Sequence, residues 1–427
     1  MSKRWVWLLS LLLCLSLFTY AKNVILFIGD GMGPSQISVA NYVSQKLFNE
    51  QLCFYSFPTI SLIDTNNATG GVTDSAAAAT ALATGVRTNN GVVGLNSNGK
   101  SVTNTPEKAK AIGKAVGIIT DNYITDATPA GFVAHTASRS NSQEIAKAFL
   151  DLKPEVFMGM GITPFQKYYQ NGESRDLIQE LIDSNYSILL GRNDLIKTDS
   201  NKIVGFFTNL DYAFLHDDIS TNPPTLREMT KKSLEALAGH EKGFFLMIEG
   251  GWIDGSCHNN DIVGTIYGIL ALNEAVKEAL AFLKDHPDTL IIVTADHETG
   301  GMSANPATLP DLVKKLPEIK RNIWAIDSLI GNSSSIEWVK AVFDQSGIKK
   351  VSQTDLKAIA SLSPGSSRRL KIGNVTTQYV GGAKYSTSGH SSQKVLLFAI
   401  GQNSDKILGQ LRNDELGQLI AKNVVGN

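Results

Sequence analysis

Residues 243–251 read Gly-Phe-Phe-Leu-Met-Ile-Glu-Gly-Gly, a continuous apolar run that ends in one carboxylate among glycines. Bulky apolar side chains in a short run bounded by glycine predict a buried strand, Phe244–Ile248. Glu249 would then stand at the carboxyl end of that strand, where open α/β sheets place their ligands. Asp254 and His258, four residues apart, could share one face of a helical turn. Together these residues suit a Zn²⁺ site with hard oxygen donors, whereas the alternative is a plain helix start followed by an unrelated histidine.

Short apolar runs alternate with longer amphipathic ones along most of the chain. Continuous rather than alternating apolar strands indicate an α/β fold, a large and mostly parallel central sheet with helices on both faces. The predicted strands are Asn23–Ile28, Ala115–Thr120, Val156–Met160, Tyr186–Leu190, Ile203–Phe207, Phe244–Ile248, Leu290–Thr294 and Val395–Ile400. The predicted helices are Ser35–Phe48, Ser142–Leu152, Ser174–Ile182, Leu226–Ala238, Asp261–Lys284 and Asp414–Asn423.

One segment, residues 303–386, departs from this alternation. It is polar, its strands are weak, and it contains two modest predicted helices, Ser335–Asp344 and Gln353–Ser361. We expect a single domain over residues 22–427, with this segment as an insertion before the last strand rather than an independent core.

The N-terminus has the composition of an export signal. Lys3 and Arg4 precede an apolar run that is short for a membrane span, and Thr19-Tyr20-Ala21 offers a small-residue cleavage site. We therefore expect residues 1–21 to be a signal peptide and the mature protein to be periplasmic or secreted, with no membrane span. Without Lys3 and Arg4 the chain has 37 basic and 40 acidic residues, which predicts no nucleic-acid-binding surface.

The mature chain keeps two cysteines, Cys53 and Cys257, which could form one disulfide in an oxidising compartment. Cys257 could instead be a soft metal ligand, although its neighbour His258 is the better candidate. Residues 94–101 match the spacing of a P-loop, but no buried strand precedes them and no helix follows directly. Asn96 to Gly99 is better explained as a hairpin turn.

Two further segments place reactive side chains beside glycine or at a helix start. Asp30 lies between Gly29 and Gly31 after the first predicted strand, where its two oxygens could bridge two cations. Ser75 opens an alanine-rich run that predicts a helix. Ser75 could be an ordinary N-cap, or its hydroxyl could lie at the helix N-terminus where a phosphate is favoured.

The remaining candidates follow other strands. Asp126 and Thr128 come after the strand that begins at Ala115, and Arg139 could clamp two phosphate oxygens, although a turn and a surface arginine explain these residues equally well in isolation. Asp296-His297 closely follows the Leu290–Thr294 strand, so these two residues, like Glu249, would lie at the carboxyl end of a buried strand. Among the seven histidines, His258, His297 and His390 lie near strand ends or glycine turns, and surface or capping roles are expected for His135, His216, His240 and His286.

Taken in order, these segments resemble the alkaline phosphatase family. The match comprises Gly29 to Gly33, Thr73 to Ala76, Asp126 to Pro129 with Arg139, Glu249-Gly250 with Asp254 and His258, Thr294 to His297, and Gly389-His390. The resemblance covers nearly the whole mature chain and implies an enzyme that hydrolyses phosphate monoesters at alkaline pH. It also implies small phosphomonoester substrates and a homodimer.

The resemblance further implies two zinc ions and one magnesium ion. Asp254, His258 and His390 would hold the first zinc, and Asp30, Asp296 and His297 the second, beside Ser75. Thr128 and Glu249 would join Asp30 at the magnesium, with Asp126 there directly or through water. Ser75 would be the nucleophile of a phosphoserine intermediate, and Arg139 would bind the phosphoryl oxygens.

One residue departs from the family pattern. Gly255 follows Asp254, whereas many relatives have Lys, His or Trp at or near this position, close to the phosphate or the magnesium. Alternative functions within the same superfamily are a phosphodiesterase, a sulfatase or a mutase, but the Ser75 region lacks the C/S-x-P-x-R context of sulfatases. A different class is an inactive secreted protein that binds metal or phosphate, although such a protein needs no nucleophile.

Overall fold

The computed structural model describes residues 21–426 apart from 167, 171–172 and 211–221. The predicted signal peptide therefore lies outside the described residues except for Ala21, as does His216. No helix within the described residues is long and apolar enough to cross a membrane.

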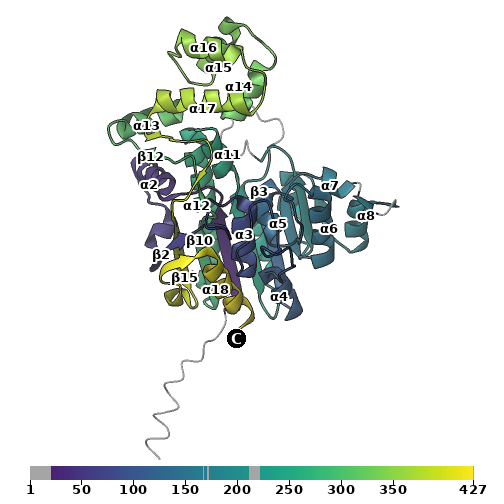
Figure 1. The fold of residues 1–427 in the computed structure, drawn as a ribbon. Helices are drawn as coiled ribbons and strands as arrows, with labels where there is room; N and C mark the ends of the chain where they lie inside the picture. The colour runs from purple at the N-terminus through teal and green to yellow at the C-terminus, as the bar shows by residue number, and fades with distance from the viewer. Residues whose placement is uncertain (1–20, 167, 171–172, 211–221, 427) are drawn as a thin grey trace, which may run out of the picture.

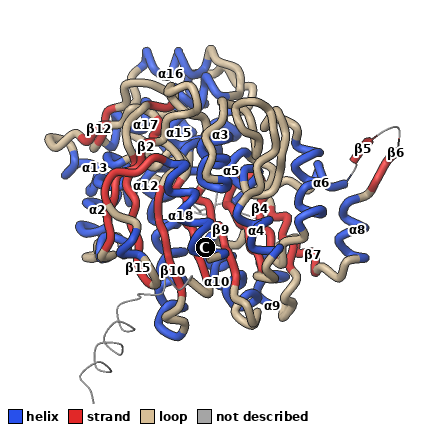
Figure 2. The backbone as a smooth tube through the Cα atoms, turned by 60° about the horizontal axis from the view of Figure 1, so that its bottom comes forward, coloured by secondary structure: helices blue, strands red, loops and turns tan. Residues whose placement is uncertain are grey.

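A ten-stranded sheet forms the centre of the molecule (Figures 1 and 2). Its strands lie in the order β16 (Gly409–Arg412), β2 (Thr59–Asp64), β15 (Val395–Gly401), β10 (Thr289–Thr294), β1 (Asn23–Gly29), β9 (Phe244–Gly250), β3 (Ala115–Tyr123), β4 (Val156–Met160), β8 (Ile203–Phe207) and β7 (Ser187–Leu189). β15 is antiparallel to both of its neighbours, and the other pairings in the sheet are parallel. The predicted mostly parallel α/β fold is thus confirmed, and every predicted strand is present with ends shifted by at most a few residues.

Helices cover both faces because the central strands are apolar on both sides. Every residue of β1, β9 and β10 is buried. One face contacts α10 (Leu226–Leu237) and α12 (Ile262–Asp285), and α12 also packs on α2 (Pro34–Phe48). The other face contacts α4 (Thr105–Ala111), α5 (Ala127–Gly131) and α18 (Asn413–Val425), with α3 (Ser75–Thr84) packed on α5 and α18. The remaining helices of this part are α6 (Ser142–Leu152), α7 (Thr163–Gln166), α8 (Leu177–Asp183), α9 (Arg192–Lys197) and α11 (Trp252–His258).

Two strands of the ten-stranded sheet were not predicted, β2 and β16. In β2 the alternation is inverted, since Ile60 and Leu62 are exposed while Thr59 and Ser61 are buried. The buried hydroxyls donate to the carbonyl groups of Ser404 and Ile407, which satisfies them without water. A pattern search for apolar residues on the inner face could not find such a strand.

The segment 303–386 is more helical than the sequence predicted. It contains α13 (Leu309–Lys315), α14 (Ile323–Ile330), α15 (Ile336–Gln345), α16 (Gln353–Ala360) and α17 (Ser366–Val380), at the top of Figure 1. Short strand pairs enclose it, with β12 (Ser303–Ala304) on β13 (Ala383–Lys384) and β11 (Glu298–Thr299) on β14 (His390–Ser391). Its apolar residues form a second core, which is completed by α2 (Val39, Val43) and α12 (Ile262, Val263, Ile266).

A buried ion pair lies within this second core. The Arg368 guanidinium on α17 donates to the Asp327 carboxylate on α14 and to the carbonyl groups of Asp327 and Gly331, both at 2.7 Å. Arg368 has no exposed surface, so its charge depends on these partners.

Removing Arg368 should therefore destabilise the inserted segment. We expect Arg368→Ala to lower the free energy of unfolding by roughly 3 kcal/mol, because Asp327 then loses its main counter-ion while remaining buried. Urea unfolding followed by circular dichroism measures this. Lys340→Ala, which removes an exposed ion pair with Asp344 on α15, is the control and should cost less than about 1 kcal/mol. Equal effects of the two variants would contradict the buried-pair argument.

Candidate metal centre and nucleophile

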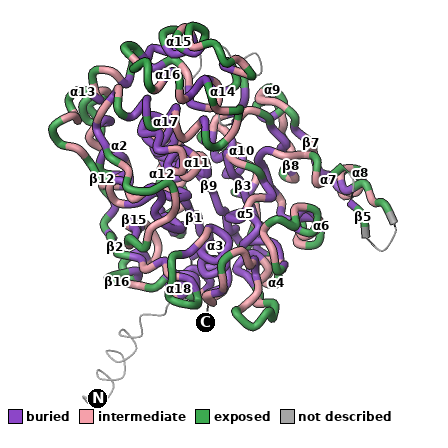
Figure 3. The backbone as a smooth tube through the Cα atoms, turned by 45° about the horizontal axis from the view of Figure 1, so that its top comes forward, coloured by how far each residue is buried: buried purple, intermediate pink, exposed green. Residues whose placement is uncertain are grey.

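The candidate ligands converge because they follow neighbouring parallel strands. Ile28 of β1 lies opposite Thr294 of β10 and also opposite Glu249 of β9, so these strands end at the same edge of the sheet. Thr120 of β3 lies opposite Glu249 on its other side. Figure 3 shows that β1, β3 and β9 are buried at the centre of the molecule. The residues just beyond these strands are thereby brought together, as the sequence predicted.

A buried cluster consists of Asp30, Asp296 and His297, whose ligand atoms lie within 4.8 Å of one another. His297 Nε2 is 3.4 Å from Asp30 Oδ1 and 3.2 Å from Asp296 Oδ2. Asp30 Oδ1 and Asp296 Oδ2 are buried and have no hydrogen-bond partner. Since buried carboxylate oxygens are rarely left unpaired, this donor set fits a cation held by two carboxylates and one imidazole.

An outer cluster consists of Asp254, His258 and His390. Nδ1 of His258 lies 2.6 Å from the Ser388 carbonyl oxygen, and Nδ1 of His390 lies 2.9 Å from that of Thr73. Because a carbonyl can only accept, both Nδ1 atoms carry the proton and both Nε2 atoms of the neutral rings present lone pairs.

These two Nε2 atoms are 3.1 Å apart, and His258 Nε2 is also 3.1 Å from Asp254 Oδ2. Two lone pairs would repel each other at this distance, so a metal ion or a proton must lie between them. The outer cluster therefore has the tautomers, the distances and the outer hydrogen bonds of a histidine metal site.

A third group of orphaned oxygens lies next to the buried cluster. Both carboxylate oxygens of Glu249 and the hydroxyl of Thr128 are buried without a hydrogen-bond partner. They are hard oxygen donors of the kind that Mg²⁺ prefers, and Asp30 could share its carboxylate between this group and the buried cluster.

The electrostatics of the site without a cation are unfavourable. Burial raises the pKa of Asp30, and the charges of Asp296, Asp254 and Glu249 raise it further. Burial and the charge of Asp254 raise the pKa of Asp296 to about 7. Burial and the charge of Asp126 raise the pKa of Glu249. These carboxylates are therefore pressed toward protonation unless cations offset their mutual repulsion.

The histidines respond in opposite directions. Burial and the neighbouring His390 lower the pKa of His297, which keeps it neutral and able to donate its lone pair. Burial opposes charge on His258 as well, but the hydrogen bond and the charge of Asp254, together with the hydrogen bond to Ser388, outweigh that effect and raise the pKa of His258 to about 9. Without a metal, a proton on His258 thus takes the place of the cation in the outer cluster.

Ser75 is the first residue of α3, and Asp74, not Ser75, is the N-cap. The Asp74 carboxylate accepts from the Ala77 backbone N–H at 3.0 Å, which leaves the Ser75 hydroxyl free. Ser75 Oγ lies 3.2 Å from Nε2 of His297, so it faces the buried cluster. The simpler interpretation of Ser75 as an ordinary cap is therefore wrong.

The alanine run explains how α3 can present a serine so deep in the protein. All residues of α3 are buried, and the neighbouring helices α5 and α18 each contact it at a glycine. A Cβ on Gly131 of α5 would be 2.7 Å from the Ala79 Cβ, and one on Gly417 of α18 would be 2.2 Å from the Ala81 carbonyl oxygen. Larger side chains on either helix would push α3, and with it Ser75, away from the sheet.

Arg139 is held beside Ser75 by two carboxylates. Its guanidinium is 3.4 Å from Asp74 Oδ2 and 3.2 Å from Asp126 Oδ1. Asp126 also accepts from the Asn122 side chain at 3.1 Å. In this structure Asp126 thus orients Arg139, and Asp74 links the arginine to the cap of α3. The pairing of Asp74 with Arg139 was not predicted, although the position of Asp74 directly before Ser75 could have suggested it.

Thr299 is a second residue that sequence reasoning missed. Its hydroxyl donates to Asp254 Oδ1 at 2.5 Å and lies 3.2 Å from Nδ1 of His297, so it bridges the buried and outer clusters. The only available signal was its place two residues after His297.

The space beside Gly255 is occupied by aromatic rings from two segments. A Cβ on Gly255 would lie 3.2 Å from the Trp252 ring and 3.4 Å from the Trp324 ring. The two indoles contact edge to face, with centroids 5.0 Å apart. Trp324 belongs to α14 of the inserted segment, which therefore reaches the helix that presents Asp254 and His258.

Other sequence candidates lie outside the site. Cys53 and Cys257 are free, and the Cys257 thiol contacts the Thr265 hydroxyl rather than a ligand cluster. His135 binds the Gly94 carbonyl and Glu107, a structural role. Residues 94–101 form a turn in which Gly99 N–H donates to the Asn96 carbonyl, so the P-loop match is coincidental, as expected.

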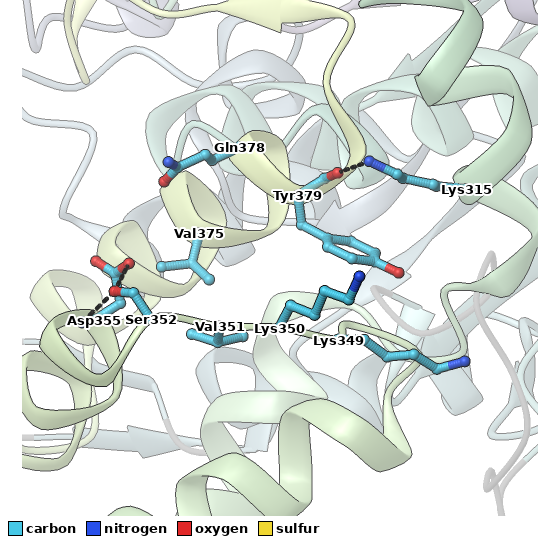
Figure 4. Close-up of a pocket in the computed structure, with 9 residues that line it drawn as sticks. All are labelled: Lys315, Lys349, Lys350, Val351, Ser352, Asp355, Val375, Gln378 and Tyr379. Carbon is cyan, nitrogen blue, oxygen red and sulfur yellow. Dashed lines mark hydrogen bonds between the residues drawn. The ribbon is translucent and has the colours of Figure 1, made fainter.

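The inserted segment has a pocket of its own, with a volume of about 540 Å³ (Figure 4). Its lining includes Lys315, Lys349, Lys350 and Tyr379, and none of the ligand residues. Figure 4 shows Lys315 donating to the Tyr379 carbonyl group, at 2.7 Å. This pocket is therefore separate from the metal centre.

Comparison with known proteins agrees with this geometry. The family model described as alkaline phosphatase matches residues 21–425. Alkaline phosphatase 4 of Bacillus subtilis is 33% identical over 94% of this chain and 88% of its own length. The alkaline phosphatase of Escherichia coli is 33% identical over 69% of this chain and 74% of its own length.

Solved structures lead to the same family. Thermus thermophilus alkaline phosphatase superposes with a TM-score of 0.86 at 26% identity, covering 96% of this chain and 92% of the other. The cold-active alkaline phosphatase of a Shewanella species has a TM-score of 0.81 at 29% identity, covering 95% of this chain and 100% of the other. A mutant of the TAB5 alkaline phosphatase with Mg bound in its M3 site has a TM-score of 0.66 at 26% identity, covering 96% and 99%. The chain belongs to the alkaline phosphatase family and is a metal-dependent phosphomonoester hydrolase.

Proposed function

We propose that this enzyme hydrolyses phosphate monoesters at alkaline pH through a phosphoserine on Ser75, at a centre of two zinc ions and one magnesium ion. The observation that carries the proposal is the position of the Ser75 hydroxyl, 3.2 Å from His297 and at the N-terminus of α3. Export by the predicted signal peptide and assembly as a homodimer remain part of the proposal.

The residues fit the proposed metals as follows. Asp254, His258 and His390 would hold one zinc, and Asp30, Asp296 and His297 the other. Glu249 and Thr128 supply oxygens for magnesium beside Asp30, with Asp126 acting there directly or through water. The Mg found in the M3 site of the TAB5 mutant supports a magnesium position in this family. When bound, the metals would lower the pKa of the serine hydroxyl and stabilise charge on the leaving oxygen.

The chain's own residues then account for the reaction. Ser75 Oγ loses its proton to solvent and forms a bond to phosphorus while the bond from phosphorus to the alcohol oxygen breaks, and the alcohol departs with a proton from solvent. Water then attacks the phosphoserine and releases phosphate, so two in-line displacements give net retention at phosphorus. The backbone N–H groups that open α3 and the Arg139 guanidinium would both face the transferred group and offset its negative charge.

Substrate choice follows from the Arg139 clamp. A monoester has three non-bridging oxygens, so two can bind the guanidinium while the third is left for the metal ions, whereas a diester has only two in all. Asp74 and Asp126 hold the guanidinium in place before substrate arrives.

Replacing the nucleophile gives the first test. Ser75→Ala should keep its bound metal but lose at least about a hundredfold in kcat for p-nitrophenyl phosphate, because the covalent step is removed. Metal content by elemental analysis and turnover at alkaline pH measure the two effects. Ser142→Ala, which changes the first residue of α6 in the same way, is the matched control and should be fully active. Undiminished activity in Ser75→Ala would refute covalent catalysis.

Preference for monoesters gives the second test. The enzyme should hydrolyse p-nitrophenyl phosphate with a much higher kcat/KM than bis-p-nitrophenyl phosphate. Arg139→Ala should lower kcat/KM for the monoester roughly tenfold or more, and so reduce the ratio of the two kcat/KM values. A chelator should abolish turnover, and Zn²⁺ with Mg²⁺ should restore it. A marked preference for the diester would instead assign the chain as a phosphodiesterase.

The pKa shifts give a third test, on the chelated protein. The raised pKa of Asp296, about 7 against about 4 in an unfolded chain, means that folding takes up a proton, so stability falls as pH rises through this window. Asp30 and Glu249 act in the same direction, and so does His258, whose pKa of about 9 adds stability that is lost at higher pH. His297 and Asp254 oppose them, because their pKa values are lowered, although Asp254 acts only at pH values below about 4.

The melting temperature of the chelated protein should therefore fall between pH 5 and pH 8, whereas bound metal offsets the carboxylate repulsion. The stabilisation by metal, measured by differential scanning fluorimetry with and without EDTA, should grow over that range. A metal effect that is constant with pH would show that these carboxylates do not face the ions.

A further inference from the structure

Glu298 is a buried carboxylate that the proposed reaction does not use. It directly follows His297, has no exposed surface, and begins β11. β11 pairs with β14, in which Thr299 lies opposite His390 and Glu298 opposite Ser391. This two-residue ladder therefore joins the strand that follows a ligand of the buried cluster to the strand that contains a ligand of the outer cluster.

The Glu298 carboxylate binds three separate segments. Oε1 accepts from the Gln36 side chain on α2 at 2.7 Å and from the Met302 backbone N–H at 3.0 Å. Oε2 accepts from the Ser391 hydroxyl, one residue beyond His390. Gln36 is also fully buried and donates to the Thr299 carbonyl group at 2.8 Å.

The third glycine of the Gly29–Gly33 motif exists to admit this carboxylate. A Cβ on Gly33 would lie 2.2 Å from Glu298 Cγ and 2.7 Å from Gln36 Oε1. Because Gly33 has an ordinary extended backbone, its lack of a side chain serves close packing and not a special turn. The loop that presents Asp30 is thus fitted against Glu298.

We propose that Glu298 is a positioning residue that holds His390 and His297 at the spacing needed for two metal ions, an inference that rests on the proposed metal centre. The His297 and His390 rings stack with centroids 3.6 Å apart and planes inclined by 22°. Their spacing depends on the register of β11 against β14, and Glu298 fixes that register through Ser391 while Gln36 and Met302 fix Glu298.

A carboxylate suits this position better than an amide. Three donors converge on its two oxygens, and in the described part of the chain no Lys or Arg pairs with it. Hydrogen bonds to an ionised acceptor are stronger than those between neutral groups, so a carboxylate ties a ladder of only two residues per strand more firmly than an amide would.

The test measures zinc affinity directly. Metal-free wild type, Glu298→Ala, Glu298→Gln and Ser391→Ala are each titrated with Zn²⁺ in competition with a chromophoric chelator. We expect Glu298→Ala to bind one of its two zinc ions at least about tenfold more weakly, in the range observed for outer partners of metal-binding histidines. Ser391→Ala and Glu298→Gln should weaken the same ion by smaller factors, and they keep the test informative if Glu298→Ala fails to fold.

Activity and stability separate positioning from a merely structural role. Excess Zn²⁺ should restore most of the kcat of Glu298→Ala, whereas it cannot rescue Ser75→Ala. Glu107→Ala is the matched control, since Glu107 also accepts a backbone N–H, from Asn104, and binds His135 but lies away from the ligands. It should lower the melting temperature without changing zinc affinity.

The outcomes distinguish this inference from the proposed function. Wild-type zinc affinity retained in Glu298→Ala, Glu298→Gln and Ser391→Ala would overturn the positioning role and leave the two-zinc centre intact. A wild-type protein that binds no zinc would overturn the proposed function itself. Combining Glu298→Ala with Ser391→Ala should weaken zinc binding no further than Glu298→Ala alone, because both remove the same contact.

Discussion

Repulsion among carboxylates buried at one edge of the sheet is the constraint on which the active site depends. Asp30, Glu249 and Asp296 are drawn together by the parallel register of β1, β9 and β10, and burial makes their charges costly. A protein can relieve this cost by protonation or by bound cations. The orphaned oxygens of these residues and the facing Nε2 atoms of the outer cluster both favour cations, which is why we propose metal ions at this edge of the sheet.

Rigid, closely packed elements surround that charge. Ser75, the proposed nucleophile, lies on a helix of small residues that Gly131 and Gly417 allow to approach its neighbours, and the loop of Asp30 packs against Glu298 at Gly33. The small size of glycine and alanine thus matters here because it lets neighbouring helices and side chains approach closely. The conformational freedom of glycine matters less at these positions. The positions of the proposed metal ligands and of Ser75 are thus fixed by packing contacts among residues that do not themselves bind metal.

Much of this could be predicted from the sequence, because apolar runs define the strands and ligand types gather at their ends. Glu249 and Asp296 could be placed at one sheet edge by that logic alone. The exposed face of β2, with Ile60 and Leu62 outside, contradicts the assumption on which such prediction depends. The pairing of His258 with His390, which are 132 positions apart, followed from the family resemblance and could not be derived from local sequence patterns.

The inserted segment is tied to the catalytic centre by packing and not only by chain connection. Its core continues into α2 and α12, the helices that follow the Asp30 loop and the outer-cluster helix α11. Trp324 closes the space beside Gly255, on the same turn as Asp254, so the side chain missing from α11 is replaced by one from α14. A Cβ at position 255 would press closely on the Trp252 ring and touch the Trp324 ring, so little space is left for a larger side chain. Gly255, where the chain departs from the family pattern, therefore packs against Trp324. In this way the insertion covers the helix that presents the proposed metal ligands Asp254 and His258.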